Sequence, residues 1–245
     1  MKLKGIDSNG LKMIACLSML IDHITYAFIP EYSVDGWMGV NVAYLVGRGL
    51  GRSAFVIFAF LLVEGVYHTK DRKRYALTML MAAVVSELPF DYLIGRLNSA
   101  DFLVRQNVMF TFTLGIVSMI LLEEIKDRYL YQDSKLAYNG LSVSVCMAAF
   151  TVAYFLRVDY GVVGIALIFI FYFLRGMKKR NIALMVFIWS IGCIFLEHML
   201  EWAGLIALIP IFLYNGERGS KNLKWLFYVF YPLHMLVIGV IRWVI

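Results

Sequence analysis

The strongest constraint on the fold is the segment Arg48–His68, whose central part, Ser53–Val63, carries no charge. As an α-helix, residues 52–67 rise about 24 Å, a little less than the thickness of the hydrocarbon core of a bilayer. Arg48 and Arg52 stand at one end of this segment, and Glu64 stands near the other. Ionisable groups at both ends of an apolar span cost several kcal/mol unless they reach the interface, pair, or face a wet cavity. The segment therefore predicts a helix that works inside a membrane.

The rest of the chain repeats this apolar pattern. Apolar residues make up 61% of the 245 residues and charged residues only 16%, which is typical of multi-span membrane proteins. We expect an all-α polytopic helix bundle that forms one domain over residues 1–245. It has about nine transmembrane helices: Leu11–Ile29, Arg48–His68, Tyr75–Ile94, Asn107–Leu122, Leu136–Phe155, Tyr160–Leu174, Ile182–Leu196, Ala203–Tyr214 and Leu223–Val244.

Three features of this plan are less regular. Pro30–Gly47 and Glu123–Lys135 are predicted as loops, and part of the first is apolar enough for an interfacial position or a short extra helix. Ala203–Tyr214 is short for a span, so it is either extended through Trp202 or re-entrant. The three cysteines fall inside apolar segments without CxxC spacing, which argues against disulfides and against a zinc site. We expect no metal.

The loops carry an uneven distribution of positive charge that predicts the orientation of the chain. With the N-terminus in the cytoplasm, 17 of the 23 Lys and Arg residues lie inside, as the positive-inside rule requires. The other six lie outside: Arg48, Arg52, Arg96, Arg105, Arg157 and Arg242. Membrane orientation thus explains the net charge of +6, and nucleic acid is not an expected partner. With nine spans, the C-terminus lies outside.

This orientation sorts the intramembrane polar residues into two layers. The outer layer contains Asp22, His23, Arg48, Arg52, Glu87 and Asp91. The inner layer contains Lys12, Glu64 and the basic cluster of Lys70, Arg72, Lys73 and Arg74, while His234 lies between the layers. The eleven-residue spacing of Lys12 and His23 puts both on one helix face, about 16 Å apart. Such a face is suited to line a channel.

Each of these groups also has a purely structural interpretation. A histidine beside an aspartate in a membrane helix is often a satisfied structural pair, and Glu87 with Asp91 has a simple role in neutralising Arg48 or Arg52. The basic cluster, taken alone, is a topology signal. The sequence does not choose between a packing role and a basic role for His234.

Four stretches carry a resemblance to a known family. They are LKMIACLSMLIDH, GRSAFVIFAFLLVEGVYHT, SELPFDYL and YPLHML. In these stretches the chain resembles the TraX family, which is associated with N-acetylation of F-pilin and is similar in helical plan to the multi-span bacterial acyltransferases. In that wider superfamily a basic residue typically precedes a first-span histidine by about ten places. Lys12 and His23 match this spacing, with Lys where Arg is commoner. That pilin substrate is not carried over on resemblance alone.

The resemblance implies acyl transfer from a coenzyme A thioester, and the two layers suit that chemistry. Cations on the cytoplasmic side would hold the phosphates, and a base near the acceptor would deprotonate it. Cofactor-binding residues are expected in the inner layer: Lys12, Glu64, Lys70, Arg72, Lys73 and Arg74. Catalytic residues are expected in the outer layer and the last span: His23 as the base, Asp22, Glu87 or Asp91 to fix its tautomer, Arg52 to stabilise the oxyanion, and His234 as a second candidate base. Arg48 is expected to share the oxyanion role or to bind an acidic acceptor.

The predicted function is therefore a multi-pass acyltransferase of the bacterial cytoplasmic membrane. Acetyl-CoA or another acyl-CoA is the expected donor, with membrane lipids around the protein and an extracytoplasmic hydroxyl or amine of a protein N-terminus, glycan or lipid as acceptor. A proton-coupled transporter is the alternative, because intramembrane Asp, Glu and His residues also form proton relays. A third alternative is a non-catalytic scaffold whose polar pairs serve packing.

Overall fold

The structure is a computed structural model that describes residues 5–33, 39–100, 102–130, 134–196, 199–219 and 223–244. These residues form helices α1 (Ser8–Phe28), α2 (Val42–His68), α3 (Arg72–Leu93), α4 (Val108–Ile125), α5 (Lys135–Phe155), α6 (Gly161–Phe173), α7 (Lys179–Leu196), α8 (Leu208–Phe212) and α9 (Lys224–Val244). A π-helical turn, Lys126–Leu130, continues α4, and a 3₁₀ helix, Met199–Ala207, precedes α8. The described chain is therefore mainly helical, as predicted, with only isolated β-bridges such as that between Tyr32 and Val40.

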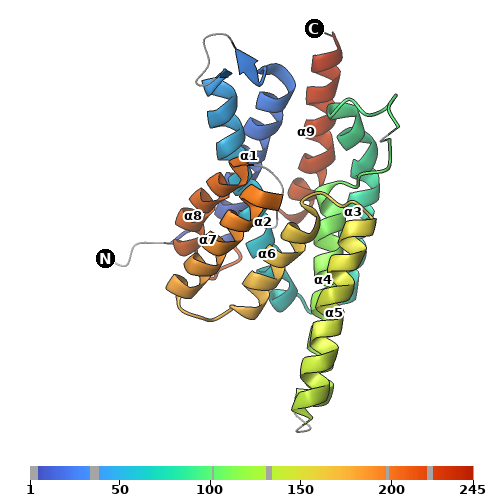
Figure 1. Cartoon of the computed structure of the whole chain (residues 1–245), viewed down its shortest axis with the longest axis vertical. Coiled ribbons are helices and arrows are strands. Elements are labelled where there is room, and N and C mark those ends of the chain that lie inside the picture. The colour runs from blue at the N-terminus through green and yellow to red at the C-terminus, as the bar shows by residue number, and fades with distance from the viewer. Residues whose placement is uncertain are drawn as a thin grey trace.

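Six of the described helices are long and apolar enough to cross a membrane: α1, α2, α3, α4 with its π-helical extension, α5 and α9. Two further apolar stretches, Gly161–Phe173 and Leu200–Phe212, are shorter. The C-terminus lies at the same end of the bundle as the α1–α2 connection, and the turn between α2 and α3 lies toward the other end (Figure 1). The predicted helical fold is thus confirmed, with six helices that are long and apolar enough to be candidate membrane spans.

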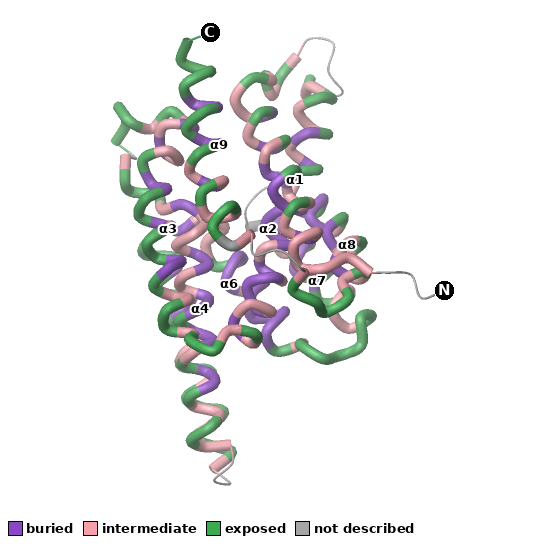
Figure 2. Tube along the Cα trace, turned by 180° about the vertical axis from the view of Figure 1, so that it is seen from behind, coloured by how far each residue is buried: buried purple, intermediate pink, exposed green. Residues whose placement is uncertain are grey.

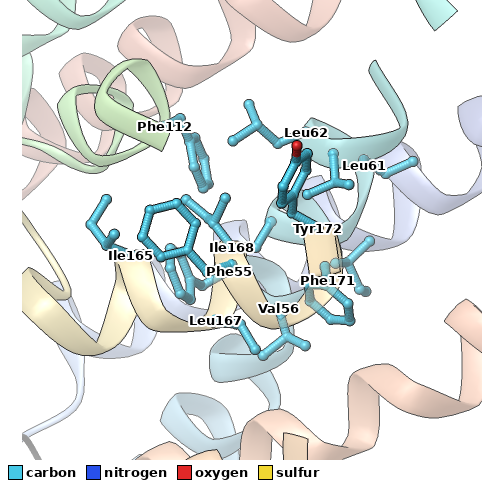
Figure 3. Packing of buried hydrophobic residues seen from close by; sticks show 14 of the residues in the cluster. Phe55, Val56, Leu61, Leu62, Phe112, Ile165, Leu167, Ile168, Phe171 and Tyr172 are labelled. Atoms are coloured by element: carbon cyan, nitrogen blue, oxygen red, sulfur yellow. The ribbon is translucent and has the colours of Figure 1, made fainter. Parts of the chain in front are cut away.

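Helix α2 lies at the centre of the bundle. In the most apolar 18-residue stretch of α2, 67% of the residues are buried, against 22% in α1 and 11% in α5. Purple buried positions accordingly run along α2 in Figure 2, whereas the green positions of α3 and α9 face outward. Phe55 of α2 stacks on Phe112 of α4, and Ile165 and Ile168 of α6 complete the cluster (Figure 3). This core fixes the helix that carries Arg48, Arg52 and Glu64.

Side-chain caps explain where four helices begin. Asp7, Asn41, Asp71 and Asn107 each precede a helix and accept a hydrogen bond from a backbone N–H of its first turn, at 2.7, 2.9, 2.8 and 3.0 Å. Such a cap satisfies a donor that the helix itself leaves free. The cap at Asn41 starts α2 at Val42, so the predicted loop Pro30–Gly47 was too long, and its residues 34–38 lie outside the described part.

The predicted charged loop Glu123–Lys135 was also wrong at its start. The helix continues through Glu123 to Ile125, and the π-helical turn extends it to Leu130, while residues 131–133 lie outside the described part. Glu123 is buried, and its carboxylate accepts hydrogen bonds from Tyr172 at 2.8 Å and Tyr67 at 3.2 Å. Two hydroxyl donors remove the cost that a bare carboxylate carries in the core.

The predicted eighth segment is a broken helix that packs along α2. The 3₁₀ helix Met199–Ala207 runs into the short α8, whose Pro210 sits in the first turn, where the missing N–H is not needed. A Cβ on Gly204 would approach Val56 of α2 to 3.0 Å, so this segment lies close against α2. The break places Glu201 beside Arg52, with consequences for the site below.

Two glycines of α2 let α1 approach closely. A Cβ on Gly51 would lie 2.3 Å from Cβ of Asp22, and one on Gly47 would lie 2.1 Å from Oγ1 of Thr25. The two glycines are four residues apart and therefore share one face of α2. Small residues at this spacing are a common means of bringing membrane helices together.

We expect Gly51→Ala to lower the free energy of unfolding by about 1–3 kcal/mol, because the added methyl group has no room between α1 and α2. Gly140→Ala on α5 is the matched control, since a Cβ there meets nothing within 4 Å. It should be neutral or stabilising by up to about 1 kcal/mol through helix propensity. Thermal unfolding in detergent measures both, and equal behaviour of the two variants would refute the close approach.

Candidate functional site

A cavity of about 650 Å³ joins the two layers of polar residues predicted from the sequence. Its lining includes Lys12, Glu64 and Arg74 from the inner layer. It also includes Asp22, His23, Arg48 and Arg52 from the outer layer. The prediction that Lys12 and His23 face a common space is thus confirmed. Residues that sequence reasoning did not select also line the cavity: His68, Arg96, Asp159, Tyr160 and Arg218.

His23 is hydrogen-bonded to His234. Nδ1 of His23 lies 2.7 Å from Nε2 of His234, and the two rings are tilted by only 6°. Nδ1 of His234 lies 2.7 Å from the carbonyl oxygen of Phe230. The last span therefore brings the second candidate histidine into contact with the first, across 211 residues of sequence.

The hydrogen-bond pattern assigns the tautomers of this pair. A carbonyl oxygen only accepts, so Nδ1 of His234 carries a hydrogen and donates it to Phe230. In neutral His234, Nε2 then has a lone pair and accepts the Nδ1–H of His23. Neutral His23 consequently has its own lone pair on Nε2. Since His23 lines the cavity, the arrangement leaves one basic nitrogen for a molecule bound there.

Asp22 is held by the two arginines of α2. Its Oδ2 accepts from Arg48 at 2.6 Å, and its Oδ1 lies 3.4 Å from Arg52. Arg52 also lies 3.1 Å from Glu201 and donates to the hydroxyl of Tyr160 at 3.1 Å. The sequence predicted Asp22 as one of three groups that orient His23, but the structure engages its carboxylate with Arg48 and Arg52.

Asp159 and Tyr160 enter the site from the turn before α6. Tyr160 adopts the left-handed conformation (φ 58°), and its ring stacks on Phe55 with centroids 3.8 Å apart. This places the hydroxyl at Arg52. Burial raises the pKa of Asp159, although the nearby Arg52 guanidinium opposes the shift. The only sequence signal was an acidic residue and a tyrosine at the boundary of a predicted span.

Glu87 and Asp91 serve the segment that leads into α4. Glu87 accepts from the backbone N–H of Asn107 at 3.2 Å and from its side-chain amide at 2.5 Å. Asp91 accepts from the backbone N–H of Leu103 at 2.9 Å and lies 4.0 Å from Arg96. These partners are different from the predicted partner His23. Glu87 thus gives the buried backbone N–H of Asn107 an acceptor, and Asp91 holds the backbone at Leu103.

The inner layer is only partly assembled around the cavity. Lys70, Lys73 and Arg74 are all exposed, and of these Arg74 is the one that lines the cavity. Arg72 donates to the carbonyl of Val66 at 3.3 Å. Glu64 lines the cavity but is paired with Arg175 at 2.7 Å. Of the predicted cofactor-binding cations, Lys12 and Arg74 line the cavity, and Glu64 lines it as the partner of Arg175.

The fold and this cavity define a helical membrane protein with an internal cavity that has ionisable side chains at both ends. The chain belongs to the TraX family, whose model, described as TraX protein, matches residues 7–242. The predicted resemblance is therefore confirmed.

A curated relative supports this assignment. It is named probable fimbrial assembly protein FimC of serogroup H1 from Dichelobacter nodosus, and the chain is 24% identical to it over 257 aligned positions that cover 96% of each protein. No solved structure matches the chain.

Proposed function

We propose that the protein transfers an acyl group, most simply acetyl, from cytoplasmic acyl-CoA to a hydroxyl or amine at the extracytoplasmic side of the membrane. The observation that supports this proposal best is the single cavity that is lined by Lys12 and Arg74 at one end and by His23 at the other. Its volume of about 650 Å³ lies within the usual range for small-molecule and cofactor sites.

In the proposed reaction His23 is the general base. Its Nε2 takes the proton of the acceptor as the acceptor oxygen or nitrogen attacks the thioester carbonyl carbon. The carbon–sulfur bond then breaks, and the leaving thiolate receives that proton. His234 acts as a positioning residue, because its Nε2 holds His23 in the tautomer with a free Nε2. It takes the role that we had expected of Asp22, Glu87 or Asp91.

Arg48 and Arg52 supply positive charge beside His23. Asp22 and Glu201 hold Arg52 from two sides, so its guanidinium is fixed before substrate arrives. Positive charge that is already oriented stabilises the developing oxyanion without reorganisation during the reaction. Arg48 lies near the rings of Tyr26 and Tyr44, and we propose that it binds an acidic acceptor.

We further propose a multi-pass protein of the bacterial cytoplasmic membrane with about nine membrane-embedded helices and a cytoplasmic N-terminus. The positive-inside bias, with 17 of 23 Lys and Arg residues on one side, supports this orientation. We expect that a reporter active only outside the cytoplasm works when fused after Ile245 and fails when inserted between Lys70 and Arg74. A reporter after Ile245 that is active only in the cytoplasm contradicts this orientation.

The fimbrial relative suggests where to look for the acceptor. Its name refers to fimbrial assembly, so the N-terminus of an exported fimbrial subunit is the first acceptor to test, followed by exported glycans and lipids. A proton-coupled transporter and a non-catalytic scaffold are the alternatives. Labelled acetyl-CoA offered to the purified protein separates them: the proposed enzyme binds or hydrolyses it, and a carrier for another solute or a scaffold leaves it intact and unbound.

A further inference from the structure

The inner end of the cavity carries an excess of positive charge among the described residues. Lys12, Arg74 and Arg218 line this end, together with the acidic Glu64 and Asp71. Glu64 pairs with Arg175 at 2.7 Å, while Asp71 keeps its charge and caps α3 by accepting from the backbone N–H of Arg74 at 2.8 Å. Within the described residues, none of the three cations has a carboxylate within 4.0 Å.

Arg218 is brought to this end by a tethered loop. The backbone N–H of Ser8 donates to the carbonyl of Glu217 at 2.8 Å, and the N–H of Asn215 donates to the carbonyl of Ile6 at 3.0 Å. Gly219 closes the loop with φ 86°, and a Cβ there would lie 2.7 Å from the side chains of Asp7 and Asn9. The loop is therefore fixed against the start of α1, the helix that carries Lys12.

We propose that Arg218 joins Lys12 and Arg74 in a binding site for the diphosphate and 3′-phosphate of coenzyme A. This inference rests on the proposed function. Three cations from α1, α3 and the loop before α9 surround a space that leads toward His23. A guanidinium group can donate two parallel hydrogen bonds to the oxygens of one phosphate, and an ammonium group adds a compact positive charge. Two arginines and a lysine therefore suit a ligand with several phosphate groups. Sequence reasoning counted Arg218 only as a loop charge, because it lies 144 positions after Arg74 and has no motif that links the two.

The test compares two variants that lose the same charge. Arg218→Gln removes the proposed contact, and Arg180→Gln is the control, because Arg180 is exposed at the start of α7 and is not among the residues that line the cavity. The full-length protein in neutral-lipid nanodiscs is titrated with coenzyme A, 3′-dephospho-coenzyme A and acetyl-pantetheine, which carries no phosphate. We expect Arg218→Gln to weaken coenzyme A binding about tenfold, which corresponds to about 1.4 kcal/mol. It should leave acetyl-pantetheine binding unchanged.

The outcomes separate this inference from the function on which it rests. If the parent binds coenzyme A and Arg218→Gln binds it equally well, the phosphate role of Arg218 is wrong and the proposed function stands. If the parent binds none of the three ligands at millimolar concentration, both proposals fail. An anionic lipid headgroup has the same chemistry, so the titration is repeated in phosphatidylglycerol nanodiscs. If Arg218→Gln changes lipid association but not coenzyme A affinity, the site belongs to lipid and the inference is overturned.

Discussion

Replacing His23 by glutamine is expected to lower acyl transfer by on the order of 10²–10⁴-fold, the usual contribution of a general base. The glutamine side chain keeps an N–H donor for Nε2 of His234 but offers no nitrogen that takes a proton at neutral pH. Membrane insertion and acetyl-CoA affinity should therefore stay close to those of the parent. Initial rates with labelled acetyl-CoA, measured beside equilibrium binding, report both quantities.

The comparison with His234→Gln decides between the two histidines. We expect this second variant to retain more activity and to alter the pH profile of kcat, because His23 keeps its lone pair but loses its fixed tautomer. A merely structural histidine would not move the pH profile. If His23→Gln transfers at near the parent rate while His234→Gln does not, the roles must be exchanged. If both remain fully active, the base lies elsewhere.

The second large effect is expected at Asp22, where Asp22→Asn should lower the free energy of unfolding by about 3 kcal/mol. The change leaves Arg48 without its carboxylate partner and Arg52 with Glu201 alone. Breaking a buried ion pair costs about 3–5 kcal/mol, and we take the lower end because the cavity leaves these groups partly accessible. Chemical unfolding in detergent measures the loss.

Asp127→Asn is the matched control for Asp22→Asn. Asp127 is exposed in the π-helical turn after α4, and losing its charge should change stability by no more than about 0.5 kcal/mol. Adding Arg48→Gln to Asp22→Asn should recover part of the lost stability, because the unpaired guanidinium is then gone. An Asp22→Asn protein as stable as the parent, with lower catalytic activity, would instead return Asp22 to its predicted role beside His23.

The helices were largely predictable from the sequence because membrane spans are set by long apolar segments and by capping residues. The errors have physical causes. Asn41 caps α2 six residues before Gly47, the predicted end of the loop. Glu123 remains inside the helix because two tyrosine hydroxyls donate hydrogen bonds to its carboxylate. For the eighth segment the sequence left two alternatives, a span extended through Trp202 or a re-entrant piece, and the structure shows a 3₁₀ helix followed by a short α-helix.

The sequence predicted part of the residue set that lines the cavity, but not which side chains pair with one another. Periodicity places Lys12 and His23 on one face, and the structure puts both on the cavity. The hydrogen-bond partner of an intramembrane side chain could not be predicted, because residues that are adjacent in sequence need not be bonded to each other. Asp22 adjoins His23 in the chain, yet the arginines of α2 take its carboxylate, and His234 reaches the imidazole from the last span. Glu201 and Tyr160, which fix Arg52, lay at segment boundaries without any distinguishing motif.

The central claim is that the cavity carries an acyl group from a donor on the cytoplasmic side to an acceptor on the other. Everted membrane vesicles expose the cytoplasmic face, and right-side-out vesicles hide it. Each is prepared from cells that make the parent protein or His23→Gln, and each receives labelled acetyl-CoA from outside. Label should accumulate on material inside everted vesicles of the parent alone. Equal labelling of parent and His23→Gln vesicles, or labelling of right-side-out vesicles by the parent, would contradict the account.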